Sequence, residues 1–159
     1  MALIRILVDG YSLLHNWPEL APGRARHSMA ARDELIAMLT HYRDAIGTPI
    51  TVVFDGGGAP KSTTVARSTP EMEVLYSKAG QTADDIIERV THRLLRYGEV
   101  LVVTDDHAER DTVISLGATT ATCDLFITQI HHALKELRLD VGRLNEREQR
   151  AFKRGGPAR

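Results

Sequence analysis

The sequence predicts an α/β fold in which a mostly parallel sheet carries helices on both faces. Short apolar runs rich in Val and Ile alternate along the 159 residues with longer segments of helical periodicity, the order that produces parallel sheets. Three of these runs are followed directly by acidic residues, which are Asp9, Asp55, Asp105 and Asp106. Because ligands bind at the carboxyl ends of parallel strands, these acids mark one edge of the expected sheet as the functional one.

The first expected strand covers residues 3–8, which are apolar apart from Arg5, as in a strand buried on both faces. Residues 12–27 contain two prolines and a glycine and predict a loop with a short helical turn. Ser28 can cap a helix that runs to about residue 45. A glycine and a proline then end this helix before a second strand at residues 50–54.

After the second strand the pattern changes to a loop at residues 56–60. Residues 61–70 are rich in Thr and Ser and predict an exposed, mobile segment. A short third strand is expected at residues 73–76. Thr82 begins the next helix, and Asp85 stands three residues later, the spacing of a capping box with Asp in place of the usual Glu or Gln.

The last third of the chain repeats the alternation. A strand is expected at residues 100–104, a helix at 107–116 closed by a glycine, and a short strand at 118–122. The final amphipathic helix is expected from residue 123 to about 139. The domain organisation that follows is one α/β domain over residues 1–140 and a basic, partly disordered C-terminal extension over residues 141–159.

Composition places the chain among soluble proteins. A hydrophobic fraction of 43% with 26% charged residues is ordinary for a globular domain. No run of apolar residues approaches the length of a transmembrane helix, and the N-terminus fits a strand better than a signal peptide. The single Cys123 excludes an intramolecular disulfide and a cysteine-rich zinc site. We therefore expect a cytoplasmic protein without membrane contact.

The net charge of −1 does not by itself indicate a nucleic-acid-binding protein. The charges are nevertheless uneven: between Arg143 and Arg159 six basic residues oppose Glu146 and Glu148, a local charge of +4. A second basic stretch contains Arg24, Arg26 and His27. Such patches contact phosphates in some proteins and are solvated surface in others.

Several carboxylates at one sheet edge favour a divalent metal ion. Two unit charges about 4 Å apart repel by roughly 4 kcal/mol at an effective dielectric of about 20. A bound Mg²⁺ or Mn²⁺ removes this repulsion, and both ions prefer oxygen ligands. Each acid also has a purely structural explanation. Asp9 and Asp55 can serve turns, Asp84 the N-terminal dipole of a helix, Asp85 its capping box, and Asp105 or Asp106 the cap of the following helix.

Four segments together resemble the YacP-like NYN domains, which belong to the PIN-like nucleases. The segments are Val8-Asp9-Gly10-Tyr11-Ser12-Leu13-Leu14-His15, Val53-Phe54-Asp55, Thr82-Ala83-Asp84-Asp85-Ile86-Ile87 and Val103-Thr104-Asp105-Asp106. The resemblance extends over residues 4–137, most of the chain. It implies a three-layer α/β/α sandwich with an acidic, metal-dependent endoribonuclease site.

The resemblance also implies roles for individual residues. Asp9, Asp84 and Asp106 match the acidic positions of the family and are the expected catalytic residues and metal ligands, with Asp106 rather than Asp105 at the T-x-D position. Asp105 and Asp55 are expected to support the metal. Ser12 stands where the family typically has Asn, which changes any substrate contact at that position.

The function predicted from the sequence is hydrolysis of single-stranded or mRNA-like RNA with Mg²⁺ or Mn²⁺ activating water. Two alternatives remain open: a non-catalytic RNA-binding or adaptor module, and a metal-dependent DNA nuclease or phosphohydrolase. The residues expected to contact the substrate are Tyr11, Ser12, Arg24, Arg26, Lys61, Lys78 and Arg110.

Overall fold

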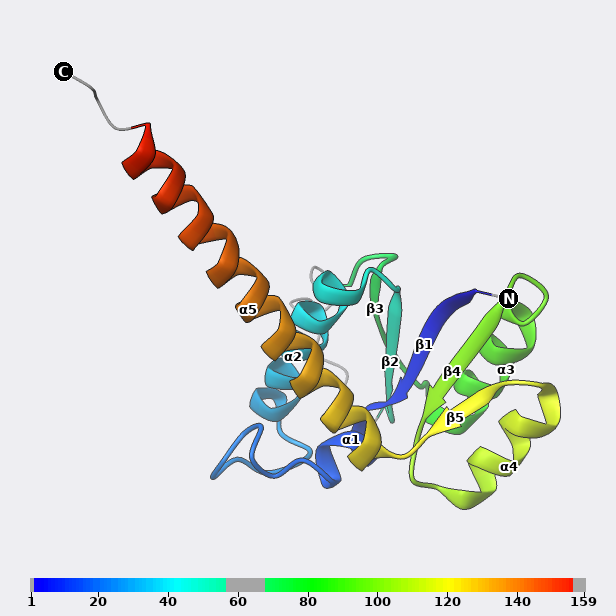
Figure 1. Cartoon of the computed structure of the whole chain (residues 1–159). Helices are drawn as coiled ribbons and strands as arrows, with labels where there is room; N and C mark the ends of the chain where they lie inside the picture. Colours follow the sequence, from blue (N-terminus) through cyan, green and yellow to red (C-terminus); the bar gives the residue numbers. More distant parts are fainter. Residues whose placement is uncertain (1, 57–67, 156–159) are drawn as a thin grey trace.

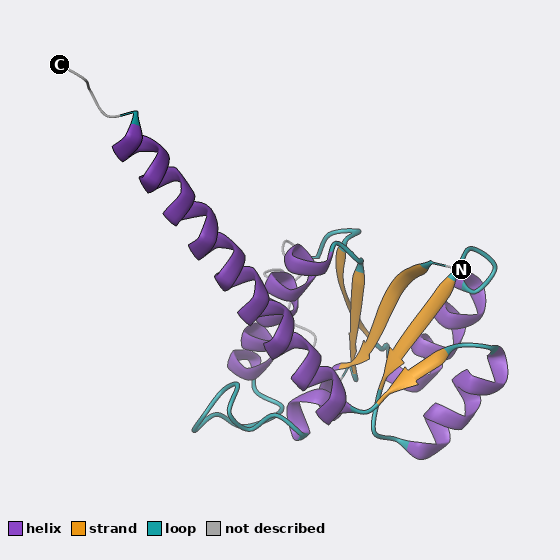
Figure 2. Cartoon of the chain, in the orientation of Figure 1, coloured by secondary structure: helices purple, strands orange, loops and turns teal. Residues whose placement is uncertain are grey.

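Apolar side chains fill the central strands because helices cover both faces of the sheet, and all five residues of the second strand are buried. The computed structural model describes residues 2–56 and 68–155. Its sheet is made of five strands (Figure 2), which are β1 at Leu3–Asp9, β2 at Ile50–Phe54, β3 at Met72–Tyr76, β4 at Glu99–Val103 and β5 at Thr119–Ala121. All pairings are parallel, and the strands lie in the order β3-β2-β1-β4-β5 (Figure 1).

The strand order places β1 in the middle of the sheet, between β2 and β4. Val8 lies opposite Val52 on one side and Val103 on the other. Because all the pairings are parallel, the carboxyl ends of the strands meet at one edge. Asp9, Asp55 and Thr104 therefore emerge at neighbouring positions of that edge.

Helices pack on both faces of the sheet, as the alternation of elements predicts (Figure 1). The helices are α1 at Gly10–His15, α2 at Met29–Ile46, α3 at Ala83–Leu94, α4 at His107–Leu116 and α5 at Cys123–Arg154. One core cluster joins the sheet to α1, α2 and α5, with Leu39 and Phe126 fully buried. A second cluster joins the other face to α3 and α4 through Ile87 and Val113.

The expected helix starts are confirmed by their caps. The Ser28 hydroxyl accepts a hydrogen bond from the Ala31 amide at 3.1 Å, and Gly47 ends the same helix in the left-handed conformation. The predicted capping box at α3 is formed in full by Thr82 and Asp85.

One boundary prediction is wrong: α5 does not end near residue 139 but continues to Arg154. Residues 140–154 contain no proline, and ten of the fifteen are Arg, Glu, Lys, Gln, Leu or Ala, which favour the helix. The other boundaries differ from the predicted ones by a residue or two, except that the short helical turn begins at Gly10, directly after β1. The predicted mobile segment at residues 61–70 lies mostly outside the described residues.

No helix in the described part of the chain is both long and apolar enough to cross a membrane.

Candidate metal centre

The sheet edge at the ends of β1 and β4 is the switch point of this fold. The chain leaves β1 toward the α2 face of the sheet and enters β4 from the α3 face. Helices on opposite faces leave a crevice between such strands, and ligands bind there in open α/β sheets. Asp9 is the last residue of β1, and the N-termini of α3 and α4 flank the same crevice.

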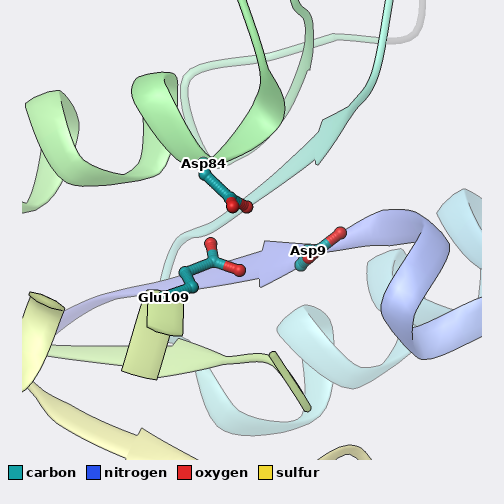
Figure 3. A group of neighbouring side chains, drawn as sticks. All are labelled: Asp9, Asp84 and Glu109. Atoms are coloured by element: carbon teal, nitrogen blue, oxygen red, sulfur yellow. The ribbon is translucent and has the colours of Figure 1, made fainter. Parts of the chain in front are cut away.

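Three carboxylates from three different elements converge at this point. Asp9 comes from β1, Asp84 from the first turn of α3 and Glu109 from the first turn of α4 (Figure 3). One oxygen from each carboxylate lies within 4.8 Å of the others. Side chains at this separation can share one cation, and we refer to Asp9, Asp84 and Glu109 as the acidic cluster.

Asp9 is held by the turn into α1. Its Oδ1 accepts a hydrogen bond from the Ser12 amide at 3.4 Å and caps the helix. Burial raises the pKa of Asp9 to about 6, and the negative charges of Asp84 and Asp55 act in the same direction. The hydrogen bond from Ser12 therefore fixes the direction of the Asp9 side chain, while the surroundings of Asp9 disfavour its ionised form.

Glu109 is the most deeply buried member, with 2% of its surface exposed. The Thr104 hydroxyl donates to its Oε2 at 2.8 Å. Within the described part of the chain, no donor reaches the buried Oε1. Burial raises the pKa of Glu109 to about 9, with a further contribution from the charge of Asp9. A carboxylate oxygen without a donor, facing two other carboxylates, is satisfied by a proton or a cation.

Asp84 completes the cluster from the first turn of α3. Because Thr82 and Asp85 cap that helix, Asp84 is not needed as its cap. The pKa of Asp84 is raised by partial burial and by the charges of Asp106, Asp55 and Asp85. The donor set of the cluster is made of carboxylate oxygens alone, which is the chemistry that Mg²⁺ and Mn²⁺ prefer.

The carboxylates of the remaining predicted ligands accept hydrogen bonds from backbone amides at the rim of the crevice. Asp106 caps α4, and its Oδ1 accepts from the amides of Ala108 at 2.9 Å and Glu109 at 3.2 Å. The Oδ1 of Asp105 accepts from the Cys123 amide at 2.9 Å. The Oδ1 of Asp55 accepts from the Ala83 amide at 2.7 Å. Their roles as ligands stay predictions.

Glu109 was missed at the level of sequence because an acid in the first turn of a helix has an ordinary explanation in the helix dipole. A signal was present nonetheless. Glu109 and Val113 stand four residues apart and share one face of α4, and both are buried. An acid that lies on the apolar face of a helix is directed into the protein, unlike an acid that only interacts with the helix terminus.

Two predicted substrate contacts, Tyr11 and Ser12, follow Asp9 in helix α1. The Ser12 hydroxyl accepts from the Asp105 amide at 3.1 Å and lies 3.6 Å from Cys123 Sγ. Tyr11 packs between His27 and Phe54, with ring centroids 4.5 and 5.2 Å away, and its hydroxyl accepts from Arg32. Both side chains therefore contact protein groups, and both residues remain partly exposed.

The predicted basic contacts are spread more widely. Arg24 and Arg26 line a pocket of about 230 Å³ beside Trp17, and Arg26 also contacts the His15 ring. Arg110 follows Glu109 on α4, and Lys78 is exposed after β3. Lys61 lies outside the described residues. These five roles stay predictions.

Cys123 lies close to the cluster without being suited to nucleophilic chemistry. It is fully buried, and burial raises the pKa of its thiol to about 12. A thiolate is the reactive form of cysteine, so at neutral pH this side chain is a packing residue.

Comparisons with known proteins agree with the fold. A family model described as the YacP-like NYN domain matches residues 6–155. A curated relative, the "Uncharacterized protein YacP" of Bacillus subtilis strain 168, is 32% identical over 114 residues, 71% of this chain and 66% of the relative. The match thus spans just under two thirds of that relative's length.

Two solved structures share the fold. A crystal structure of Rae1 (YacP) from Bacillus subtilis, carrying the W164L substitution, matches with a TM-score of 0.75 and 26% identity, covering 91% of this chain and 85% of that one. A second crystal structure of Rae1 (YacP) matches with a TM-score of 0.75 and 24% identity, covering 96% and 86%. Because the family model spans nearly its whole length and the fold is shared with these structures, this chain belongs to the YacP-like NYN domain family.

Proposed function

We propose that this protein is a divalent-metal-dependent endoribonuclease. The observation that carries the proposal is the acidic cluster, in which three carboxylates meet and a buried oxygen of Glu109 lacks a hydrogen-bond donor among the described residues. Membership of the NYN family supports RNA as the substrate. A carboxylate cluster without a cation would repel the phosphates of RNA, so the cluster and the substrate are compatible when a cation is bound.

Asp9, Asp84 and Glu109 would hold Mg²⁺ or Mn²⁺ between them. When bound, such an ion lowers the pKa of a coordinated water and offsets charge on a phosphodiester. The chain's own contribution is to fix the ligands. The turn into α1 orients Asp9, and Thr104 orients Glu109. Because Thr82 and Asp85 form the capping box of α3, the Asp84 carboxylate is not used as a helix cap.

Thr104 is a positioning residue within this arrangement. Its hydroxyl lies 2.8 Å from Glu109 Oε2 and 3.4 Å from Asp9 Oδ2, and it accepts from the Asp106 amide at 3.1 Å. A hydroxyl has one proton to donate. The shorter contact therefore goes to Glu109, and Asp9 keeps that oxygen for the cation.

The direct test is cleavage of an unstructured single-stranded RNA by wild type and by Asp84→Asn with Mn²⁺ present. We expect internal cleavage by wild type, loss of activity with EDTA, and a loss of at least about 100-fold in the variant, since Asn cannot supply a charged ligand. Asp85→Asn is the matched control, because it changes the neighbouring acid of the same helix turn. Equal cleavage by wild type and Asp84→Asn would refute the assignment.

The same assay separates the alternatives. Competition between RNA and DNA of identical sequence distinguishes a ribonuclease from a DNA nuclease. Chelator-insensitive RNA binding without cleavage would instead identify a non-catalytic binding module.

A further inference from the structure

The C-terminal part of α5 projects away from the rest of the molecule (Figure 1). We call residues 141–155 the C-terminal arm. Every residue of the arm is exposed, and the Arg143 side chain keeps 68% of its accessible surface. The arm therefore presents its side chains to solvent on all sides and is open to a large partner.

One face of the arm is a row of guanidinium groups. Arg143, Arg147, Arg150 and Arg154 follow one another at intervals of four, three and four residues. Side chains at these intervals lie on the same face of a helix. At about 1.5 Å per residue the row is roughly 16 Å long, and we call it the arginine stripe. Within the described residues its one ion pair is an exposed contact of 3.6 Å between Arg143 and Asp140.

The arm also carries charge of the opposite sign to the rest of the chain. Residues 1–140 contain fourteen basic and nineteen acidic residues, a charge of −5, whereas the arm contains five basic and two acidic residues, a charge of +3. Charges in physiological salt are screened beyond about 8 Å. A polyanion approaching the projecting arm therefore meets its positive charge without the repulsion of the acidic domain.

We propose that the arginine stripe is a second RNA-binding surface, which holds the sugar-phosphate backbone of long RNA at a distance from the acidic cluster. This inference rests on the proposed function for the identity of the polyanion. Arginine suits the role because its planar guanidinium binds phosphate oxygens in a bidentate manner and is always charged. Phosphate contacts of this kind are independent of base sequence.

The geometry of α5 sets the distance between the two surfaces. The helix begins beside the acidic cluster. Cys123 Sγ lies 3.6 Å from Ser12 Oγ, and the Ser12 amide donates a hydrogen bond to Asp9 Oδ1. Arg143 follows twenty residues later in the same helix, which corresponds to roughly 30 Å. At about 3.4 Å per stacked nucleotide, that distance is spanned by roughly nine nucleotides. Short RNA thus cannot contact both surfaces at once, whereas long RNA can.

The test compares two quadruple variants that lose the same charge. The stripe variant changes Arg143, Arg147, Arg150 and Arg154 to Gln, which is a good helix former. The matched control changes the exposed Arg89, Arg93, Arg96 and Lys135 to Gln. Both are made in an Asp84→Asn background, and dissociation constants are measured for an unstructured 30-nucleotide RNA and a pentanucleotide across a range of salt concentrations. Circular dichroism verifies that helix content is unchanged.

We expect the stripe variant to bind the long RNA at least about tenfold more weakly, with the slope of log K against log salt flatter by about 3 for four lost phosphate contacts. Binding of the pentanucleotide, which cannot contact both surfaces at once, should weaken less than binding of the long RNA, and the control variant should retain affinity and slope for both RNAs. Equal losses in the two quadruple variants, or no loss in either, would overturn the inference.

These outcomes are separable from the test of the proposed function. An absence of cleavage by the wild type, with stripe-dependent binding of long RNA, would refute the nuclease and keep the RNA-binding arm. Asp84-dependent cleavage with stripe-independent binding would keep the nuclease and refute the arm.

Discussion

Asp106 and Glu109 stand three residues apart at the start of α4, the spacing of a capping box. Thr82 and Asp85 have the same spacing at α3, where both side chains serve the cap. At α4 only Asp106 does so, because Glu109 turns into the crevice and accepts from Thr104 instead. The same local pattern therefore produces a cap at one helix and a candidate metal ligand at the other.

Substitutions at these two residues separate their roles. Glu109→Gln should lower Mn²⁺ affinity at least about tenfold, because it replaces an ionisable ligand with a neutral one. Asp106→Asn should leave affinity and stability nearly unchanged, since Asn caps helices as well as Asp does. Isothermal titration of the metal-free proteins with Mn²⁺ measures both effects. A loss in Asp106→Asn as large as that in Glu109→Gln would establish Asp106 as a ligand.

At the scale of elements, the turn from β1 into α1 sets the position of Asp9. Helix α1 begins at Gly10, directly after the strand, and the buried Phe54 ring lies against this glycine. A Cβ atom added to Gly10 would lie 2.3 Å from Phe54 Cε1. The approach of α1 to β2, and with it the direction of the Asp9 side chain, depends on the absence of a side chain at residue 10.

Gly10→Ala is therefore expected to destabilise the fold by about 1–3 kcal/mol, the cost typical of overpacking in a core. Gly142→Ala is the matched control, because a Cβ atom at Gly142 meets nothing within 4 Å and alanine favours the helix. Urea denaturation measures both variants. A fully stable Gly10→Ala protein would show that Phe54 can move without cost.

The two parts of α5 differ in their support from the rest of the fold. Phe126 and Ile130 are fully buried in the core shared with α2, whereas the arm has no buried residue. An isolated helix of about 15 residues is marginal in water. Amide hydrogen exchange should therefore be fast over residues 145–154 and slow over 126–133. Slow exchange across the arm of the free protein would indicate that it is covered, for example by a second copy of the chain.

At the scale of the whole molecule, bringing the carboxylates together lowers the stability of the fold. Asp9 and Glu109 have raised pKa values in the fold, so the folded chain holds protons that the unfolded chain releases at lower pH. Raising the pH then removes stability, because protons leave the folded state only at a free-energy cost. Each unit of pKa shift corresponds to about 1.4 kcal/mol, so the effect is on the order of a few kcal/mol.

In EDTA, the Tm of the wild type is therefore expected to fall as the pH rises from about 5 to about 9. Mn²⁺ at pH 8 should restore it, because a ligand that binds only the folded state stabilises that state. Glu109→Gln removes the main titrating group, so its Tm should depend less on pH in EDTA. Thermal melts followed by circular dichroism provide the measurement. Identical pH profiles for wild type and Glu109→Gln would contradict the role of Glu109.

Sequence alone was sufficient for the layered architecture. The alternation of apolar runs and amphipathic segments is local and periodic, and it placed each strand to within a residue or two. The parallel order then required Asp9 and Asp55 to emerge at one edge, since the carboxyl ends of parallel strands coincide. The Thr82–Asp85 box could likewise be identified from spacing, because a helix cap involves only neighbouring residues.

The composition of the acidic cluster was decided by tertiary structure. Periodicity shows which side chains share one face of a helix, but not what lies opposite that face. Glu109 joins the cluster because α4 packs with its buried face toward β1 and α3, and Asp106 points to its own helix because free amides lie within reach. Likewise, the sequence showed that the C-terminal residues are basic, but it did not predict that α5 continues through them. Only the packing of the first half of α5 on α2 decided that the arginine stripe stands clear of the domain.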